Sequence, residues 1–318
     1  MYISNPLTFS RPAISVDIED WPQSSFNHDL PITERAAVNT RRLLGVLRDT
    51  GVRTTMFVLG KFAETFPDVV REIHADGHAV ACHGYGHVEI FKQSRREFAE
   101  DVRRAKDILE QIIGERVRGY RAPDFSVVRD TLWSLGVLAE ADFEYDSSIF
   151  PVRRPRYGIP EWPVAPVEVA VNGGQHILEV PIATLQWLGK NWPVGGGGYH
   201  RFFPGLLSRY FARRVMANAP FIFYCHPYEF DPQELKMISI KVPLHIRLHQ
   251  GLGRRWFLSR FKAFLVQFGG QPIEDLVSSR TWAELDLDSF SRSISISAGS
   301  VPQANGVSLR TYSRPPDV

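Results

Sequence analysis

The chain has 318 residues, 44% of them hydrophobic and 23% charged, which is the composition of a folded globular protein rather than a disordered or fibrous one. Its net charge of +2 and isoelectric point near 8.5 are too mild to indicate a nucleic-acid partner. No run approaches the roughly 20 apolar residues of a transmembrane helix, and the amino terminus lacks a signal-peptide pattern, so we expect a cytoplasmic location.

Strand-like and helix-like stretches alternate along the first two-thirds of the chain. Short apolar or β-branched runs predict strands at residues 13–18, 54–59, 79–82, 117–121, 143–145 and 221–225. Apolar residues at helical spacing, ended by glycines in most cases, predict helices at residues 34–47, 62–77, 94–113 and 130–139. Strands that alternate with single helices are typical of a parallel sheet or barrel.

The clearest of these helices begins at Ser94. Ser94 and Glu97 have the spacing of a capping box, in which each side chain accepts a hydrogen bond from the backbone of the other residue. Six apolar residues then recur on one face before Gly114: Phe98, Val102, Ala105, Ile108, Leu109 and Ile112. One side of this helix is therefore expected to be buried.

Chemically capable side chains follow four of the predicted strands. They are Asp17, Glu19 and Asp20 at the first strand, His83 at the third, Arg121 at the fourth and His226 at the last apolar run. Because functional groups of parallel sheets and barrels collect at the carboxyl ends of the strands, we expect these residues to share one site.

The strongest chemical signal is the sequence His83-Gly84-Tyr85-Gly86-His87. On a helical turn, two imidazoles four residues apart lie on the same side and can bind a divalent ion such as Zn at about 2.0–2.1 Å. Taken alone, the spacing is also compatible with two surface or turn histidines that bind no metal. A carboxylate from the acidic cluster at residues 17–20 would complete a three-ligand site that leaves positions open for water and substrate.

Five segments, read in order, resemble the successive motifs of the NodB-homology polysaccharide deacetylases, carbohydrate esterase family 4. They are Ser15-Val16-Asp17-Ile18-Glu19-Asp20, His83-Gly84-Tyr85-Gly86-His87, Arg121-Ala122-Pro123, Tyr145-Asp146-Ser147-Ser148 and Phe223-Tyr224-Cys225-His226-Pro227. The chain is most similar in character to the cytoplasmic peptidoglycan-deacetylase and allantoinase-like branch, and to deacetylases of exopolysaccharide and O-antigen clusters. The resemblance implies an α/β fold, a distorted and incomplete (β/α) barrel with long loops and a C-terminal helical extension.

Three parts are expected along the chain. The resemblance implies a NodB-like deacetylase domain at residues 1–232 and an extension packed on the barrel at residues 233–289, and the Ser-rich composition without periodicity predicts a poorly ordered tail at residues 290–318. Residues 151–199 are rich in Pro, Gly and Trp and are expected to form long excursions around the mouth of the barrel. Their tryptophans either stack on sugar rings or pack in the core: Trp162, Trp187 and Trp192.

Position by position, the resemblance implies that Asp17 is the catalytic base and that His83 and His87 are metal ligands. Two residues remain candidates for the third ligand. Glu19 shares a strand face with Asp17, whereas Asp20 turns inward if the strand ends before it.

His226 matches the general acid that protonates the leaving amine in this family. Arg121 would pair with Asp17 and keep it ionised. The alternative for His226 is a histidine buried in the core, and the alternative for Arg121 is an ion pair on the surface. Cys82 and Cys225 each precede a site residue and are expected to face the packing as inert thiols, because neighbours on a strand point to opposite faces.

Further polar residues are secondary candidates. Asp124 could orient a catalytic group, and Asp146 could line the acceptor side of the site. The alternatives are a turn residue for Asp124 and a capping residue for Asp146. Five arginines could meet a phosphate or lipid-pyrophosphate group, with a solvated surface as the alternative: Arg153, Arg154, Arg156, Arg213 and Arg214.

Together these residues predict a hydrolase that uses a divalent metal, Zn in the first instance, to remove an N-acetyl or similar small acyl group from an amino sugar in surface-polysaccharide biosynthesis. Its partner would be an N-acetylated sugar or glycan, free or lipid-linked. Two alternatives are hydrolysis of another C–N bond, as in a cyclic amide or N-formyl sugar, and carbohydrate binding without catalysis.

Overall fold

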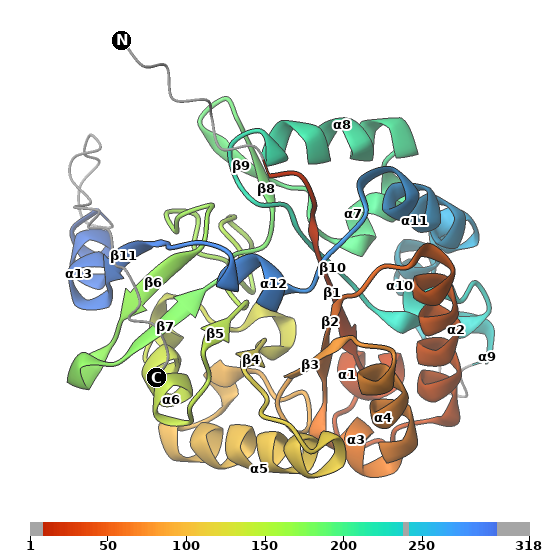
Figure 1. The fold of residues 1–318 in the computed structure, drawn as a ribbon, viewed down its shortest axis with the longest axis horizontal. Helices are drawn as coiled ribbons and strands as arrows, with labels where there is room; N and C mark the ends of the chain where they lie inside the picture. Colours follow the sequence, from red (N-terminus) through yellow and green to blue (C-terminus); the bar gives the residue numbers. More distant parts are fainter. Residues whose placement is uncertain (1–8, 238–241, 298–318) are drawn as a thin grey trace.

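The computed structural model describes residues 9–237 and 242–297, which form an α/β fold built on a largely parallel sheet (Figure 1). In these residues the main sheet has the strand order β10-β1-β2-β3-β4-β5-β7-β6-β11, and β8 and β9 form a separate pair. All neighbours in the main sheet are parallel except β6 and β7. The predicted α/β architecture is confirmed.

The strands predicted in the first two-thirds of the chain all form. The main sheet contains these strands and three that were not predicted, β6, β7 and β11: β1 Ala13–Ile18, β2 Thr55–Val58, β3 Ala79–Cys82, β4 Gly119–Tyr120, β5 Tyr145–Asp146, β6 Val167–Ala170, β7 His176–Glu179, β10 Ile222–Cys225 and β11 Ala283–Asp286. All six residues of β1 and all four of β2 are buried. Burial of both faces is what a parallel sheet covered by helices requires.

Helices surround these strands (Figure 1). They are α1 Trp21–Ser25, α2 Glu34–Thr50, α3 Gly60–Thr65, α4 Pro67–Ala75, α5 Arg95–Ile113, α6 Ser134–Glu140, α7 Gly197–Phe202, α8 Gly205–Met216, α9 Glu234–Met237, α10 Leu244–Gly251, α11 Arg254–Phe268, α12 Ile273–Ser278 and α13 Leu287–Ser297. No helix within the described ranges is long and apolar enough to span a bilayer.

The single helix predicted at residues 62–77 is two helices. Helix α3 ends at Thr65, and α4 begins at Pro67 after a non-helical Phe66 with φ −129° and ψ 60°. Proline has no N–H and clashes with the preceding turn inside a helix, but it is well suited to the first helical position. The apolar spacing predicts the helical residues, but Pro67 divides them into two helices.

The segment at residues 151–199 contains more regular structure than the predicted loops. Strands β6 and β7 join the main sheet, and β8 (Thr184–Trp187) and β9 (Lys190–Pro193) form an antiparallel hairpin. Trp162 is a core residue packed against Phe290, whereas Trp187 and Trp192 are exposed on the hairpin.

The predicted C-terminal extension is not purely helical. Its strand β11 pairs in parallel with β6 and covers that edge of the sheet. Helix α11 contacts α2, α7 and α8. Of the predicted tail, residues 290–297 lie in α13, and residues 298–318 fall outside the described chain.

Both cysteines are buried and unpaired, as predicted. Cys82 and Cys225 are each 0% exposed. Burial raises the pKa of both thiols above their usual range. Because the thiolate is the reactive form, these side chains act as apolar packing.

The capping box of α5 forms as predicted, and it yields a stability test. Ser94 Oγ accepts the N–H of Glu97 at 3.3 Å, and Glu97 Oε2 accepts the N–H of Ser94 at 2.8 Å. Ser94→Ala should lower the free energy of unfolding by about 1 kcal/mol in urea titrations, because one N–H at the helix start loses its partner. Arg103→Ala, in the exposed middle of the same helix, is the control, and an equal loss in that variant would contradict the assignment.

Candidate metal centre and catalytic site

The site lies where the carboxyl ends of the parallel strands meet. Ile18 is level with Val58, Val58 with Cys82, and Cys82 with Tyr120. On the other side of β1, Val16 is level with Cys225. The polar residues that directly follow these strand ends therefore share one edge of the sheet: Glu19, His83, Arg121 and His226.

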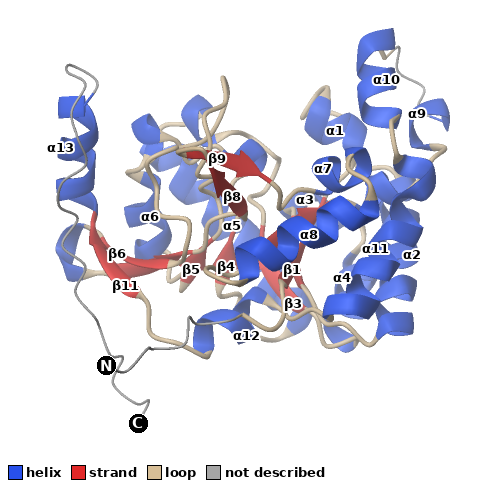
Figure 2. Ribbon diagram, turned by 90° about the horizontal axis from the view of Figure 1, so that it is seen from above, coloured by secondary structure: helices blue, strands red, loops and turns tan. Residues whose placement is uncertain are grey.

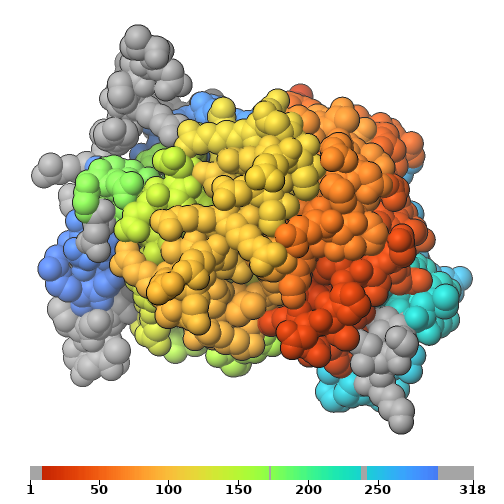
Figure 3. Space-filling model, turned by 90° about the horizontal axis from the view of Figure 1, so that it is seen from below, coloured from red at the N-terminus to blue at the C-terminus, as the bar shows by residue number. Residues whose placement is uncertain are grey.

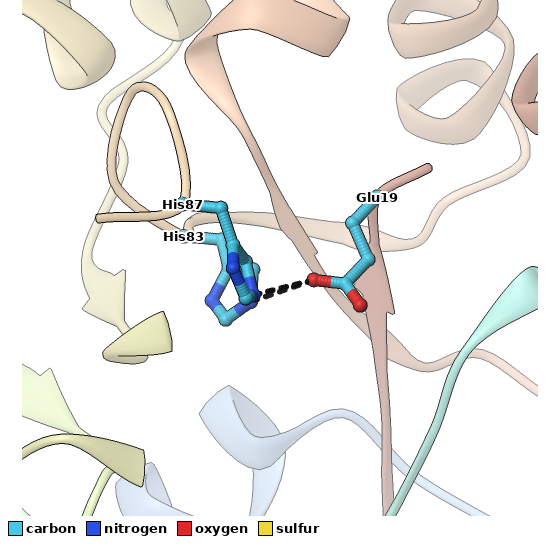
Figure 4. A group of neighbouring side chains, drawn as sticks. All are labelled: Glu19, His83 and His87. Atoms are coloured by element: carbon cyan, nitrogen blue, oxygen red, sulfur yellow. Dashed lines mark ion pairs between the residues drawn. The ribbon is translucent and has the colours of Figure 1, made fainter. Parts of the chain in front are cut away.

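Glu19, His83 and His87 converge at this edge (Figure 4). Their candidate ligand atoms all lie within 4.8 Å of one another. Glu19 Oε2 is 2.7 Å from His87 Nε2 and 3.5 Å from His83 Nε2. Figure 4 shows the carboxylate pointing from the end of β1 toward both rings, and all three side chains are buried.

The two histidines come from a loop rather than from the helical turn assumed from their spacing. Gly84 and His87 both have positive φ, 73° and 63°. A Cβ on Gly84 would lie 3.0 Å from Asp101 Oδ2, which accepts the N–H of Tyr85 at the same distance. The predicted convergence is present, but a left-handed loop tied to α5 produces it.

The hydrogen bonds of the cluster suit a divalent cation. His83 Nδ1 lies 2.8 Å from the carbonyl oxygen of Arg121, which favours a proton on Nδ1 and leaves Nε2 free as a ligand. Glu19 Oε2 is buried, and the polar atoms it faces are the Nε2 atoms of His87 and His83. Two imidazole nitrogens and a carboxylate oxygen are donors that Zn and related ions accept.

Asp20, the other candidate for the carboxylate ligand, points away from the histidines. Its Oδ2 accepts the N–H of Thr33 at 2.7 Å. Burial raises the pKa of Asp20 to about 6. The geometry favours Glu19 as the third ligand.

Arg121 is fully buried, and its guanidinium holds Asp17. Nη1 donates to Asp17 Oδ1 at 2.7 Å and to Ser15 Oγ at 2.8 Å. Nε and Nη2 donate to the carbonyl and hydroxyl oxygens of Ser147, each at 2.9 Å. The ring of Phe57 lies 4.1 Å from the guanidinium carbon. The predicted ion pair forms, and it is a core interaction rather than the surface pair of the alternative.

His226 lies opposite the histidine pair. Its Nε2 is 3.6 Å from Glu19 Oε1 and 3.9 Å from Asp17 Oδ2, while Nδ1 is 2.9 Å from Glu229 Oε1. Its side chain is 20% exposed. Burial alone would lower the pKa of His226, but the carboxylates of Glu19, Glu229 and Asp17 raise it to about 9. His226 therefore faces the cluster with its Nε2.

Three residues around His226 were missed by the sequence reasoning. Glu229 contacts Arg201 Nε at 2.8 Å, and Tyr228 stacks on the His226 ring and donates to Glu19 Oε1 at 3.2 Å. The signal for Glu229 was its position three residues after a strand-end histidine, as in a capping box. Arg201 comes from α7, and no local pattern points to it.

The secondary candidates lie outside the cluster. Asp146 and Glu179 form a fully buried carboxyl pair, in which burial raises the pKa of Asp146 to about 6 and that of Glu179 well above its usual range. Asp146 accepts a hydrogen bond from Ser148. Asp124 pairs with Arg156.

A large open cavity lies beside the metal cluster. Its volume is about 1080 Å³, and His28 on its wall has its ring centroid 5.7 Å from that of His87. The wall combines aromatic and charged side chains with residues of α10: Trp21, His28, Phe91, Asp124, Arg156 and His249. This size and lining suit a polar ligand with flat apolar faces.

Two family models cover most of the chain. Residues 25–143 match the family described as polysaccharide deacetylase. The chain contains a polysaccharide deacetylase domain. Residues 147–278 match a domain of unknown function, DUF3473. The predicted family resemblance is confirmed. The deacetylase match includes His83, His87 and Arg121, but Asp17 and Glu19 precede it.

Curated relatives of the deacetylase domain have related names. The peptidoglycan-N-acetylglucosamine deacetylase of Bacillus cereus is 24% identical over 124 residues, 39% of this chain and 40% of that protein. The chitooligosaccharide deacetylase of Azorhizobium caulinodans is 27% identical over 118 residues, 37% of this chain and 50% of that one. The chain thus spans half or less of the length of these relatives.

A solved structure supports the fold over nearly the whole chain. A Mycobacterium smegmatis protein assigned as a polysaccharide deacetylase aligns with a TM-score of 0.54 and 20% identity, covering 98% of both chains. At this identity the likeness shows that the two proteins share a fold.

The geometry of the cluster predicts which variants lose a bound cation. Glu19→Gln, His83→Ala and His87→Ala should each weaken zinc binding by about tenfold or more, because each removes one donor. Asp20→Asn should retain the wild-type affinity. Competition with a chromogenic chelator measures the zinc affinity of each variant. If Asp20→Asn loses zinc and Glu19→Gln retains it, Asp20 rather than Glu19 is the carboxylate ligand.

Proposed function

We propose that the chain is a metal-dependent hydrolase that removes an N-acetyl or similar small acyl group from an amino sugar of a surface polysaccharide. One observation carries the proposal. Asp17, His226 and the Glu19-His83-His87 cluster lie at one edge of the sheet, with Glu19 Oε1 3.6 Å from His226 Nε2. A base, an acid and a cation site in one place are what hydrolysis of an amide requires.

Glu19, His83 and His87 would hold the cation. A divalent ion there supplies a Lewis acid that acidifies water and polarises the acyl oxygen. Asp17 accepts the proton of the attacking water. Its Oδ1 is committed to Arg121, but Oδ2 faces the cluster. Arg121 therefore acts as a positioning residue that fixes the direction of the Asp17 carboxylate.

His226 completes the reaction on the leaving side. The C–N bond breaks as the carbonyl carbon gains oxygen from water, and the nitrogen needs a proton because an amide anion is a poor leaving group. Glu229 fixes Nδ1, which leaves Nε2 directed at the site. The products are a free carboxylate and an amine.

Acetate release from N-acetylated oligosaccharides tests the proposal. Asp17→Asn and His226→Ala should each lower kcat by about 10²–10⁴-fold, because each removes one proton-transfer group, while zinc binding persists. Asp107→Asn, an exposed acid of α5, is the matched control and should leave kcat unchanged. If both site variants release acetate at the wild-type rate, Asp17 and His226 are not the base and the acid. If zinc binds but no acyl sugar is cleaved, the carbohydrate-binding alternative gains support.

A further inference from the structure

Positive charge is concentrated in residues 180–273. This segment holds 12 of the 37 Lys and Arg but 3 of the 35 Asp and Glu, a net charge of 12 − 3 = +9, while the rest of the chain carries 25 − 32 = −7. The three acids are buried, with 2%, 3% and 1% of their surface exposed: Glu229, Asp231 and Glu234. The segment therefore presents cations with no exposed acid of its own, and Lys262 is paired with Asp49 of α2.

Large apolar side chains are exposed on the same segment. In the described part of the chain, it carries 13 of the 15 exposed large hydrophobic residues, all but Val38 and Phe91. Four of them recur at every fourth position, with exposures from 72% to 52%: Leu244 and Leu248 on α10, Leu252 in the turn that follows it, and Trp256 on α11. Helix α8 adds Leu206 at 76% and Tyr210 at 55%.

Contacts link helices α7, α8, α10 and α11, whose exposed side chains are here called the basic apolar face. Arg201 of α7 donates to the carbonyl oxygen of Gln250 in α10, and Arg260 of α11 donates to that of Arg201. Arg213 of α8 lies over the ring of Phe268 in α11. Figure 2 shows α8 crossing the view from above, with α11 next to it and α10 farther away at the upper right. Figure 3 shows that residues of the first half, in orange and yellow, cover most of the view from below.

A small cavity between α8 and α11 suits a phosphate oxygen. It has a volume of about 170 Å³ and is lined by Arg209 and Arg260. Ser208 also lines it, and its buried Oγ has no hydrogen-bond partner among the described residues. Guanidinium groups and a free hydroxyl are the donors that phosphate prefers.

We propose that the basic apolar face docks on an anionic lipid bilayer. At such a surface apolar side chains enter the boundary between headgroups and acyl chains, while arginines meet lipid phosphates. A second copy of the chain docked face to face would bring like charges together, and a nucleic acid would leave the leucines in water. Helix α10 also lines the cavity beside the metal cluster through His245 and His249. Docking would therefore hold that cavity next to the membrane.

Vesicle sedimentation with the full chain tests the proposal without any need for activity. The protein should sediment with phosphatidylcholine vesicles that contain phosphatidylglycerol and stay in solution with phosphatidylcholine alone. Binding should fall as salt is added, because ions screen exposed charges. The result is independent of whether the chain hydrolyses an acyl sugar.

Paired variants locate the contact. Arg214→Glu with Arg255→Glu should lower the partition coefficient by about 25-fold or more, since each cation near an anionic surface contributes about fivefold. Leu206→Ser with Leu248→Ser should lower it by about tenfold through lost apolar burial. Thermal unfolding of each variant establishes that it is folded.

The control reverses the same number of charges elsewhere. Arg71→Glu with Arg103→Glu, exposed on α4 and α5, should leave vesicle binding close to the wild-type value. The proposal is overturned if no binding to anionic vesicles occurs at low salt, or if the control weakens binding as much as the pair on the face. Self-association or DNA binding in place of vesicle binding would also overturn it.

Discussion

The parallel register of β10, β1, β2, β3 and β4 is the constraint on which the proposed chemistry depends. Each side chain with an assigned role lies at, or within a few residues of, the end of one of these strands. A slip of one residue would turn the side chains of a strand to the opposite face. Because β1 is buried throughout, such a slip would also place Ser15 and Asp17 where apolar residues now pack.

Arg121 connects this register to the chemistry. Its guanidinium binds side chains of β1 and the backbone after β5, and it has no contact with solvent. Removing one partner of a buried ion pair leaves an uncompensated charge, which costs about 3–5 kcal/mol. The same contact that fixes the direction of Asp17 therefore also holds these strands together.

Strand ends and the histidine spacing could be predicted because they are local. Apolar runs followed by Glu19, His83, Arg121 or His226 stand out in the sequence. The choice of Glu19 over Asp20 as the metal ligand could not be predicted from the sequence. It depends on contacts with Tyr228 and Thr33, which lie in other parts of the chain. Pairing of β11 with β6 is equally non-local. The charge segregation was hidden for a different reason: the net charge of +2 sums two opposite regions.

X-ray absorption at the zinc edge tests the central claim, the convergence of Glu19, His83 and His87 on one ion, most directly. The zinc-loaded chain should show two imidazoles and oxygen ligands at about 2.0–2.1 Å, and His87→Ala should lose one imidazole from the spectrum. Sulfur in the first shell, or a spectrum unchanged by both His83→Ala and His87→Ala, would show that the ion is bound elsewhere and contradict the account.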